Sequence, residues 1–312
     1  MNIHHIKYFI ALAKRCNYRE AAQFCNVSQP AISMAIKTME DKLGGHLFDR
    51  QRSPICLSPF GVEILDHAEK ISAEYERMIN YQNDKGPIQG SVTLGIIPTI
   101  APALIPLFIG AFMGRYPKVE LRIEEVTTTN IINRINKNEL DAGIVATPID
   151  GLKLSYNSMY YEEFVVYSSS EISKEYIIPG DIDIKQLWLL EEGHCIRSQI
   201  LNLCELKAME NDKILYNAGS IDTLINLVDV QGGVTIVPEL YTNQLNTGHK
   251  KKLAFFSPPA PAREVSIMYH PYSIKKKLIN ALQQTIESII PDDMKNRKNH
   301  YNPKIDLHQS PT

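Results

Sequence analysis

The sequence predicts an α/β protein with an all-α helix-turn-helix segment at its N-terminus. Apolar side chains recur at helical spacing in the first 43 residues, and from residue 92 short apolar runs alternate with helical stretches. The 312 residues suffice for two or three compact units. With 44% hydrophobic and 22% charged residues, the chain has the balance of an ordinary globular protein.

The N-terminal segment predicts three helices. Apolar residues between Ile3 and Ala13 mark the first helix, and the second begins near Tyr18. A short turn leads into the third, which has Ser28 as its N-cap and Pro30 just inside it, and which runs to about residue 43. Two helices joined by so short a turn, the second with a polar and basic outer face, form a helix-turn-helix that places the second helix in the DNA major groove.

The charge distribution agrees with a nucleic-acid partner. Residues 1–60 hold eight Lys and Arg against four Asp and Glu, so this segment carries +4 and the remainder −6. A basic module on an acidic body suits double-stranded DNA, although a solvated charged face also explains so mild an excess.

Five positions on the third helix are candidate DNA contacts. Ser28 and the helix N-terminus, with Pro30 in its first turn, can receive a phosphate. Gln29 and Ser33 can reach base edges, and Lys37 can neutralise backbone charge.

The segment EAAQFCNVSQPAISMAIKTMEDKLGGHLFDR, residues 20–50, resembles the helix-turn-helix signature of LysR-type transcriptional regulators. The resemblance implies a wing in which Arg50 and Arg52 approach the minor groove. Met39 departs from the usual leucine, a volume-conserving change in a core position. The family further implies RNA polymerase as a protein partner.

A long linker helix is expected from Pro59 to residue 83. Its apolar positions alternate at spacings of four and three, which is a heptad seam: Ile64, Ala68, Ile71, Tyr75, Met78 and Gln82. Packing against its own chain is the alternative to pairing with a second subunit. The family implies pairing, and hence a homodimer through this helix and a dimer of dimers, that is, a homotetramer.

The remainder predicts parallel sheets flanked by helices. Apolar runs begin at residues 92, 140, 163, 214, 234 and 265. The resemblance sharpens this to two α/β lobes like those of a periplasmic binding protein, with an effector in the cleft between them. Residues 97–100 and 125–129 would lie beyond the carboxyl ends of strands, where open α/β folds bind ligands.

The predicted organisation has six parts. They are a winged helix-turn-helix domain (1–58), a linker dimerisation helix (59–83), a hinge (84–90), regulatory lobe I (91–161 plus 266–291), regulatory lobe II (162–265) and a disordered tail (292–312).

Two of the five cysteines are candidate redox residues. Cys195 follows His194 and precedes Arg197, and two potential cations near a helix start favour the thiolate, the form that attacks a peroxide oxygen. Cys204 lies nine residues on, which in an intact helix is about 13.5 Å. A disulfide tolerates no more than roughly 7 Å between Cα atoms, so a bridge would require the segment to unravel. Buried, inert thiols are the alternative.

The segment GHCIRSQILNLC resembles the redox segment of the hydrogen-peroxide-sensing LysR-type regulators, which activate oxidative-stress genes. The resemblance implies that Cys195 is peroxidatic, that Cys204 resolves it as a reversible disulfide, and that Thr99, Thr128 and His194 help hold the peroxide. Ser198 departs from the aspartate common there. Cys16, Cys25 and Cys56 are interpreted as structural, the first two in helical core-like positions.

Two other functions compete with this one. A LysR-type regulator could bind a small metabolite between its lobes without redox chemistry, or the chain could be a thiol peroxidase or solute-binding enzyme with an incidental N-terminal module. No second catalytic constellation supports an enzyme. We expect no cofactor, no metal and no membrane partner, and a cytoplasmic protein with no signal peptide and no run of 18 apolar residues.

Overall fold

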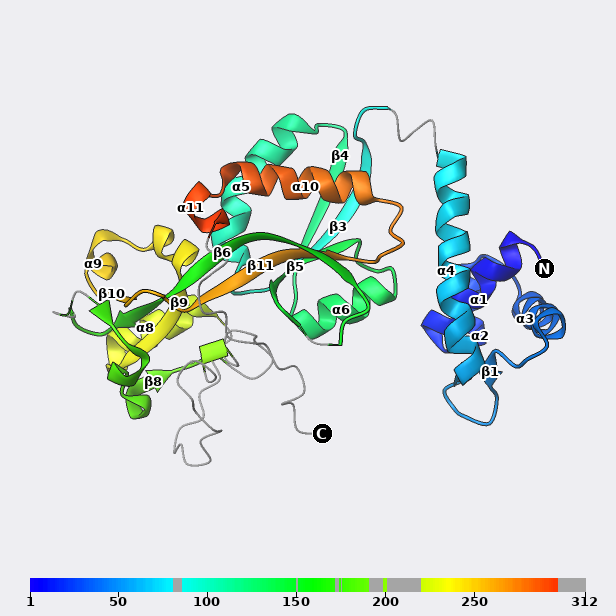
Figure 1. The fold of residues 1–312 in the computed structure, drawn as a ribbon, viewed down its shortest axis with the longest axis horizontal. Helices are drawn as coiled ribbons and strands as arrows, with labels where there is room; N and C mark the ends of the chain where they lie inside the picture. Colours follow the sequence, from blue (N-terminus) through cyan, green and yellow to red (C-terminus); the bar gives the residue numbers. More distant parts are fainter. Residues whose placement is uncertain are drawn as a thin grey trace. The chain divides into compact units, whose positions relative to one another are not determined.

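The fold is taken from a computed structural model that describes residues 1–80, 86–149, 151–171, 174, 176–190, 199–200 and 220–296. The chain forms two compact units. The first contains Met1–Pro87 with Tyr272–Lys276, and the second contains Ile88–Pro271 with the residues from Lys277 onward. Figure 1 shows the first unit as the helices α1–α4 with a small β1 wing, and the second unit as a sheet with helices packed on it. The predicted fold class is confirmed.

The first unit is a helical bundle with a two-stranded wing. Its elements are α1 (Ile3–Arg15), α2 (Tyr18–Phe24), α3 (Gln29–Leu43), β1 (Phe48–Asp49), β2 (Cys56–Leu57) and α4 (Pro59–Asn80). Side-chain caps define the helix starts: Asn2 accepts from the His5 amide, Asn17 from two amides of α2, and Ser28 from the Ala31 amide. The apolar faces of α1 and α3 meet in a core that contains Phe9 and Ile36.

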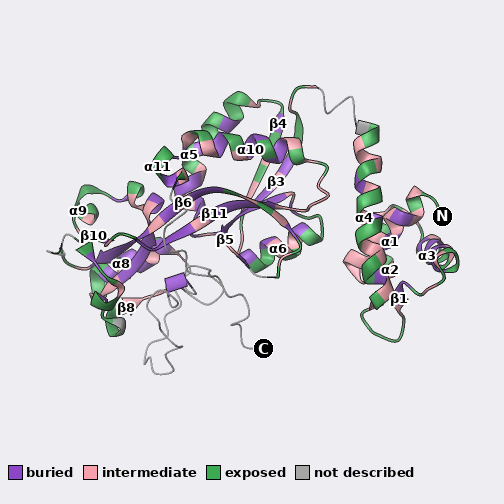
Figure 2. Cartoon of the chain, viewed as in Figure 1, coloured by how far each residue is buried: buried purple, intermediate pink, exposed green. Residues whose placement is uncertain are grey.

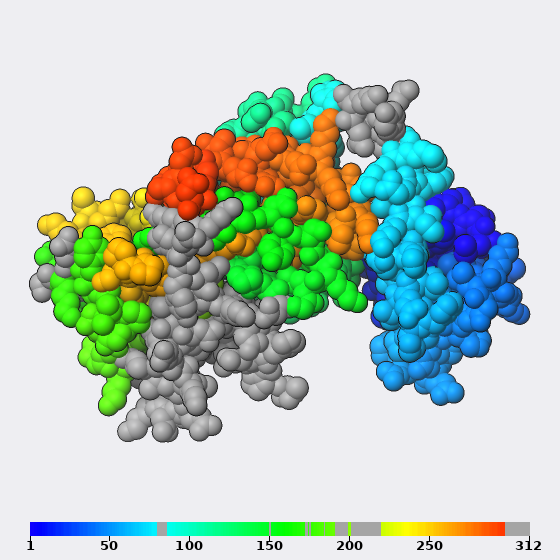
Figure 3. Space-filling view, in the orientation of Figure 1, coloured from blue at the N-terminus to red at the C-terminus, as the bar shows by residue number. Residues whose placement is uncertain are grey.

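The linker helix α4 lies against α1. Lys7 and Glu76 approach to 2.6 Å and Lys14 and Glu69 to 3.0 Å, so ion pairs join the two helices along their length. Figure 3 shows α1 in blue along α4 in cyan. One face of α4 is therefore used within its own chain.

The second unit is built on nine described strands. They are β3 (Gly90–Ile96), β4 (Val119–Glu125), β5 (Ala142–Thr147), β6 (Ser155–Ser168), β7 (Tyr176–Ile177), β8 (Leu187–Trp188), β9 (Val234–Pro238), β10 (Leu253–Phe256) and β11 (Ala262–Tyr269). Their order is β4-β3-β5-β11-β6-β10-β7, and β9 joins β6 to β8. The long strands β6 and β11 contain the predicted lobe crossings at 162 and 265.

Helices cover this sheet. They are α5 (Ala101–Arg115), α6 (Thr128–Asn136), α8 (Ile221–Gln231), α9 (Thr247–Lys250), α10 (Lys276–Ile289) and α11 (Asp292–Lys295), with the 3-10 turns η2 (Pro179–Asp181), η3 (Ile184–Gln186) and η4 (Glu239–Gln244). Figure 2 shows buried strands between helices whose outer faces are exposed.

The prediction of parallel sheets is wrong in part. β3 pairs in parallel with β4 and β5, but β11 runs antiparallel to β5 and β6, and β6 runs antiparallel to β9 and β10. The sheet is mixed because the chain passes along β6 and returns along the adjacent β11. The predicted strand at 214 lies outside the described residues.

The predicted disorder after Pro291 is also wrong for its first residues. Pro291 caps α11, and Met294 is buried in the core of the second unit. An apolar contact therefore orders this turn. Residues 297–312 lie outside the described part.

The helical core positions predicted for two cysteines need correction. Cys16 has a positive φ of 53° and caps the end of α1, and Cys25 caps the end of α2. Both are half-buried, as is Cys56. Burial raises the pKa of the Cys25 thiol, which disfavours its reactive thiolate.

A close contact at Gly143 positions α6 on the sheet. A Cβ added there would lie 2.2 Å from Cγ2 of Ile131. Ile131 is β-branched and fully buried, so its Cγ2 cannot rotate away easily. Only a glycine in β5 lets α6, and with it Thr128, approach this closely.

We therefore expect Gly143→Ala to lower the free energy of unfolding by about 1–3 kcal/mol through overpacking. Gly110→Ala is the matched control, because Gly110 lies in α5 with nothing within 4 Å of an added Cβ. The control should stabilise by about 0.5–1 kcal/mol. Urea unfolding followed by the fluorescence of Trp188 measures both; equal effects of the two variants would contradict this account of α6.

Candidate DNA-binding and sensing sites

The outer face of α3 carries the predicted DNA contacts. Ser28, Gln29, Pro30, Ser33 and Lys37 are all exposed. Gln29, Ser33 and Lys37 follow one another at intervals of four residues and so lie on one side of the helix. The helix N-terminus is capped by Ser28, whose hydroxyl accepts from the Ala31 amide at 3.4 Å.

Sequence reasoning missed Met34 on the same helix. Its side chain is 71% exposed, although methionine is apolar. An apolar side chain on a major-groove helix can contact the methyl group of thymine. The sequence spacing did not show that Met34 faces solvent. Its exposure in the structure is what makes it a candidate DNA contact.

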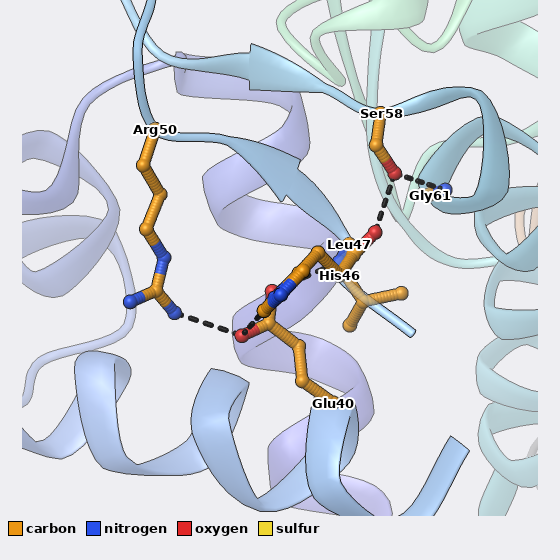
Figure 4. Close-up of polar contacts among 6 residues, drawn as sticks. All are labelled: Glu40, His46, Leu47, Arg50, Ser58 and Gly61. Atoms are coloured by element: carbon orange, nitrogen blue, oxygen red, sulfur yellow. Dashed lines mark hydrogen bonds and ion pairs between the residues drawn. The ribbon is translucent and has the colours of Figure 1, made fainter. Parts of the chain in front are cut away.

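The buried carboxylate of Glu40 organises the wing. It accepts from the Leu47 amide at 2.8 Å and from Nη2 of Arg50 at 2.8 Å, and His46 Nδ1 lies 3.8 Å away (Figure 4). On the other side of the same turn, the Ser58 hydroxyl donates to the carbonyl oxygen of His46 at 2.5 Å and accepts from the Gly61 amide at 2.9 Å. The wing is thus tied to both α3 and α4.

The two wing arginines have protein partners in this structure. Arg50 pairs with Glu40, and the more exposed Arg52 pairs with Asp49 at 3.3 Å. Their approach to the minor groove stays a prediction. Arg50 keeps a half-exposed guanidinium, so pairing with Glu40 leaves part of its charge available to a phosphate or a groove.

The predicted heptad seam of α4 is divided between two environments. Ala68 is buried against the first unit's own core, so packing within the chain accounts for that position. Ile71 and Met78, at seven-residue spacing, are 49% and 69% exposed. Ile64 is half-buried against the same core, and Gln82 lies outside the described residues. We call Ile64, Ile71, Tyr75 and Met78 the α4 stripe.

Thr99 and Thr128 lie at one edge of the sheet. The parallel strands β3 and β4 end side by side, with Ile96 paired to Glu125. Thr99 follows β3 in the turn before α5, and Thr128 is the first residue of α6 after β4. Both are buried. Open α/β folds bind ligands at such an edge.

A fully buried arginine contacts Thr99, and sequence reasoning did not single it out. Arg263 Nη1 donates to the Thr99 hydroxyl at 2.9 Å, and Nη2 donates to the Thr99 carbonyl oxygen at 3.0 Å. Arg263 Nε donates to Glu162 at 2.8 Å, and the Leu240 amide donates to the other carboxylate oxygen at 3.3 Å. Burial raises the pKa of Glu162, while the Arg263 charge acts to lower it.

The predicted redox residues lie outside the described part of the chain. These are Cys195, Cys204, His194 and Arg197. The two described residues between the cysteines, Gln199 and Ile200, are buried. Roles for the cysteines therefore stay a proposal.

Comparison with known families decides the assignment. Residues 3–62 match the model described as bacterial regulatory helix-turn-helix protein, lysR family, and residues 85–288 match the LysR substrate binding domain. The chain belongs to the LysR family. It is therefore a DNA-binding transcription regulator rather than an enzyme, which confirms the main sequence prediction.

Curated relatives of this LysR-family chain extend over nearly its whole length. It is 29% identical over 301 residues, 93% of the chain, to the hydrogen peroxide-inducible genes activator of Haemophilus influenzae, and covers 99% of that protein. It is 27% identical over 295 residues to the DNA-binding transcriptional dual regulator OxyR of Escherichia coli, at 92% and 95% coverage.

Solved structures similar to this chain are of the same kind of protein as these relatives. A cysteine-to-aspartate variant of full-length OxyR from Pseudomonas aeruginosa is 28% identical, with a TM-score of 0.70 and coverage of 92% and 94%. OxyR from Porphyromonas gingivalis is also 28% identical, with a TM-score of 0.63 over 70% of this chain and all of that one. The resemblance to peroxide-sensing members, expected from the sequence, is thus confirmed.

Among the described helices, none has the length and apolar character needed to cross a membrane. In the same part of the LysR-family chain, no three His, Cys, Asp or Glu side chains are grouped as a metal site would need.

The exposed position of Lys37 on α3 leads to a test of the DNA interface. Lys37→Ala should weaken DNA binding and reduce the slope of log binding constant against log salt by about one unit, as the loss of one phosphate contact does. Lys118→Ala, an exposed lysine of the second unit, is the matched control and should leave the slope unchanged. Titrations at several salt concentrations measure this, and an unchanged slope in Lys37→Ala would remove Lys37 from the interface.

Proposed function

We propose that this LysR-family regulator senses hydrogen peroxide through Cys195 and Cys204 and activates oxidative-stress genes in response. The observation that carries the proposal is the near full-length similarity to proteins named hydrogen peroxide-inducible genes activator. The two cysteines of GHCIRSQILNLC supply the residue types that such sensing needs. The buried Thr99 and Thr128 supply hydroxyls at the sheet edge where a ligand would bind.

The chemistry proceeds in two steps. The Cys195 thiolate attacks one oxygen of peroxide, an S–O bond forms as the O–O bond breaks, and the departing hydroxide takes a proton to become water. The sulfur is oxidised by two electrons, to a sulfenic acid. The Cys204 thiolate then attacks that sulfur, a disulfide forms, and the sulfenic oxygen leaves as a second water.

Peroxide-site residues hold the leaving oxygen in this proposal. Thr99, Thr128 and His194 would hydrogen-bond the peroxide, and Arg197 and His194 would favour the thiolate of Cys195. Bridging two cysteines nine residues apart requires any helix between them to unravel, so oxidation would change the conformation of the sensing unit.

Oligomerisation would carry that change to the DNA. We propose a homodimer joined through the α4 stripe and a dimer of dimers on double-stranded DNA, with RNA polymerase as the protein partner and the cytoplasm as the location. The exposed Ile71 and Met78 support the dimer, because apolar residues at seven-residue spacing match the seam of a helix pair. The division of the chain given above belongs to the same proposal, except that its tail begins after α11 (Asp292–Lys295).

The cysteine roles are tested by thiol titration of the full-length protein. Mild peroxide should remove two thiols per chain from the natural sequence. Cys195→Ser should lose none, because the attacking thiolate is gone, and Cys204→Ser should stop at a single oxidised thiol. Cys25→Ser is the matched control and should still lose two. Unchanged thiol loss in both Cys195→Ser and Cys204→Ser would contradict the proposal.

The dimer interface is tested by replacing the exposed members of the α4 stripe. Ile71→Gln with Met78→Gln should raise the dimer dissociation constant at least about tenfold, since burying each such side chain contributes about 1.5–3 kcal/mol. Glu63→Gln, exposed on the same helix but outside the stripe, should leave it unchanged. Sedimentation equilibrium measures both; an unaltered association in the double variant would place the interface elsewhere.

A metabolite-responsive regulator is the second candidate. The chain is 30% identical over 245 residues, 78% of its length, to the HTH-type transcriptional regulator EstR of Acinetobacter baylyi, whose name does not mention peroxide. In a metabolite-responsive regulator, Cys195 and Cys204 would be buried and would not react with peroxide. Thermal shifts with peroxide and with a panel of small metabolites separate the two functions.

A further inference from the structure

The outward face of α3 carries one large apolar side chain, Met34. The structure describes every residue of this helix, and among them Met34 is the one large apolar side chain that is exposed, at 71%. The apolar residues of the inner face are buried: Ile32, Ala35, Ile36 and Met39. A single exposed apolar residue is ordinary on a protein surface, so exposure alone assigns Met34 no role.

The position of Met34 on the helix is the second observation. Successive residues of an α-helix are turned by about 100°, and on that geometry Met34 lies nearly opposite the mean direction of the buried residues of α3. Lys37 lies about 60° to one side of Met34. Gln29 and Ser33 lie nearer the edge of the exposed face. An apolar and a cationic side chain therefore occupy the middle of the surface that a helix-turn-helix presents to DNA.

The chemistry of the side chain restricts its partner in the major groove. A helix-turn-helix places the N-terminal part of its second helix against base edges, and Met34 is the sixth residue of α3. A thioether has no hydrogen-bond donor and is only a weak acceptor, so it cannot select the polar edge of guanine, adenine or cytosine. The C5-methyl group of thymine is the apolar group exposed in this groove. A contact between the two removes apolar surface from water on both sides.

The backbone that carries Met34 is held in place independently of its side chain. Ile32 and Ile36 are fully buried in the core of the first unit. The Thr38 hydroxyl donates to the carbonyl oxygen of Met34 at 2.8 Å. The unbranched side chain can adjust its rotamers to the position of a methyl group. A substitution at this position therefore changes the contact with DNA and leaves the helix where it is.

We propose that Met34 is a specificity-determining residue, which selects thymine at a fixed operator position by contacting its C5-methyl group. Gln29, Ser33 and Lys37 can supply hydrogen bonds and charge, whereas Met34 supplies an apolar contact that none of these three can make. The inference rests on the DNA-binding function of the LysR family. It is independent of whether Cys195 reacts with peroxide.

Replacement of thymine by deoxyuridine tests this directly, because it removes the C5-methyl group and keeps every hydrogen-bonding group of the base. The probe is a duplex selected from a randomised DNA pool by the reduced full-length protein, with its thymines replaced one at a time. For the natural sequence, at least one replacement should raise the Kd about threefold to fivefold, as expected for one methyl group no longer buried. In Met34→Ala the same replacement should change the Kd by less than about 1.5-fold.

Lys37→Ala is the matched control on the same face of α3. It should weaken binding to every duplex, yet keep the full effect of deoxyuridine, because a phosphate contact does not involve the methyl group. Met34→Leu should also keep most of that effect, since leucine is apolar and of similar volume.

Met34→Ala is expected to fold, because the side chain is exposed and alanine favours the helix. Should thermal unfolding show otherwise, Met34→Gln replaces it, since glutamine keeps the length of the side chain and makes its end polar. A deoxyuridine effect that persists undiminished in Met34→Ala or Met34→Gln would overturn the inference. So would a natural protein whose Kd is unchanged by every thymine replacement.

Discussion

The buried ion pair between Glu162 and Arg263 is the interaction on which the sensing unit depends. It fastens β6 to β11 where the chain passes between its two predicted lobes, and it reaches the turn before α5 through Thr99 and the start of η4 through Leu240. Four segments far apart in the sequence therefore share one charged pair. Because the pair is buried, moving either partner would leave an unpaired charge in the interior, so the positions of these four segments are tightly constrained.

The DNA-binding unit uses the same device on a smaller scale. Glu40 is buried in α3, and its carboxylate fixes the Leu47 amide and the Arg50 guanidinium at the start of the wing. In both units a buried carboxylate pairs with an arginine next to a predicted site. The difference is exposure: Arg50 is half-exposed and remains open to solvent, whereas Arg263 is sealed inside.

Local chemistry made the helical unit predictable. The Ser28 cap and the apolar spacing of α3 are short-range signals, and they place that helix to within a residue. Arg263 and Glu162 are 101 positions apart, so no local pattern reveals their contact. The strands β7 and β8 have two residues each, too few to show an alternation of apolar and polar side chains. The short helix α11 is ordered by a single buried methionine, Met294. The strand ends pointed to residues 97–100 and 125–129, but only the family resemblance singled out Thr99 and Thr128 within them.

In the proposed function, oxidation of Cys195 changes how the regulator binds DNA. Footprinting of the full-length protein on one promoter fragment, reduced and peroxide-treated, tests it most directly. The account predicts that the protected region changes length or position on oxidation in the natural sequence, and stays in its reduced form in Cys195→Ser. Identical footprints before and after complete oxidation of the natural protein would contradict it.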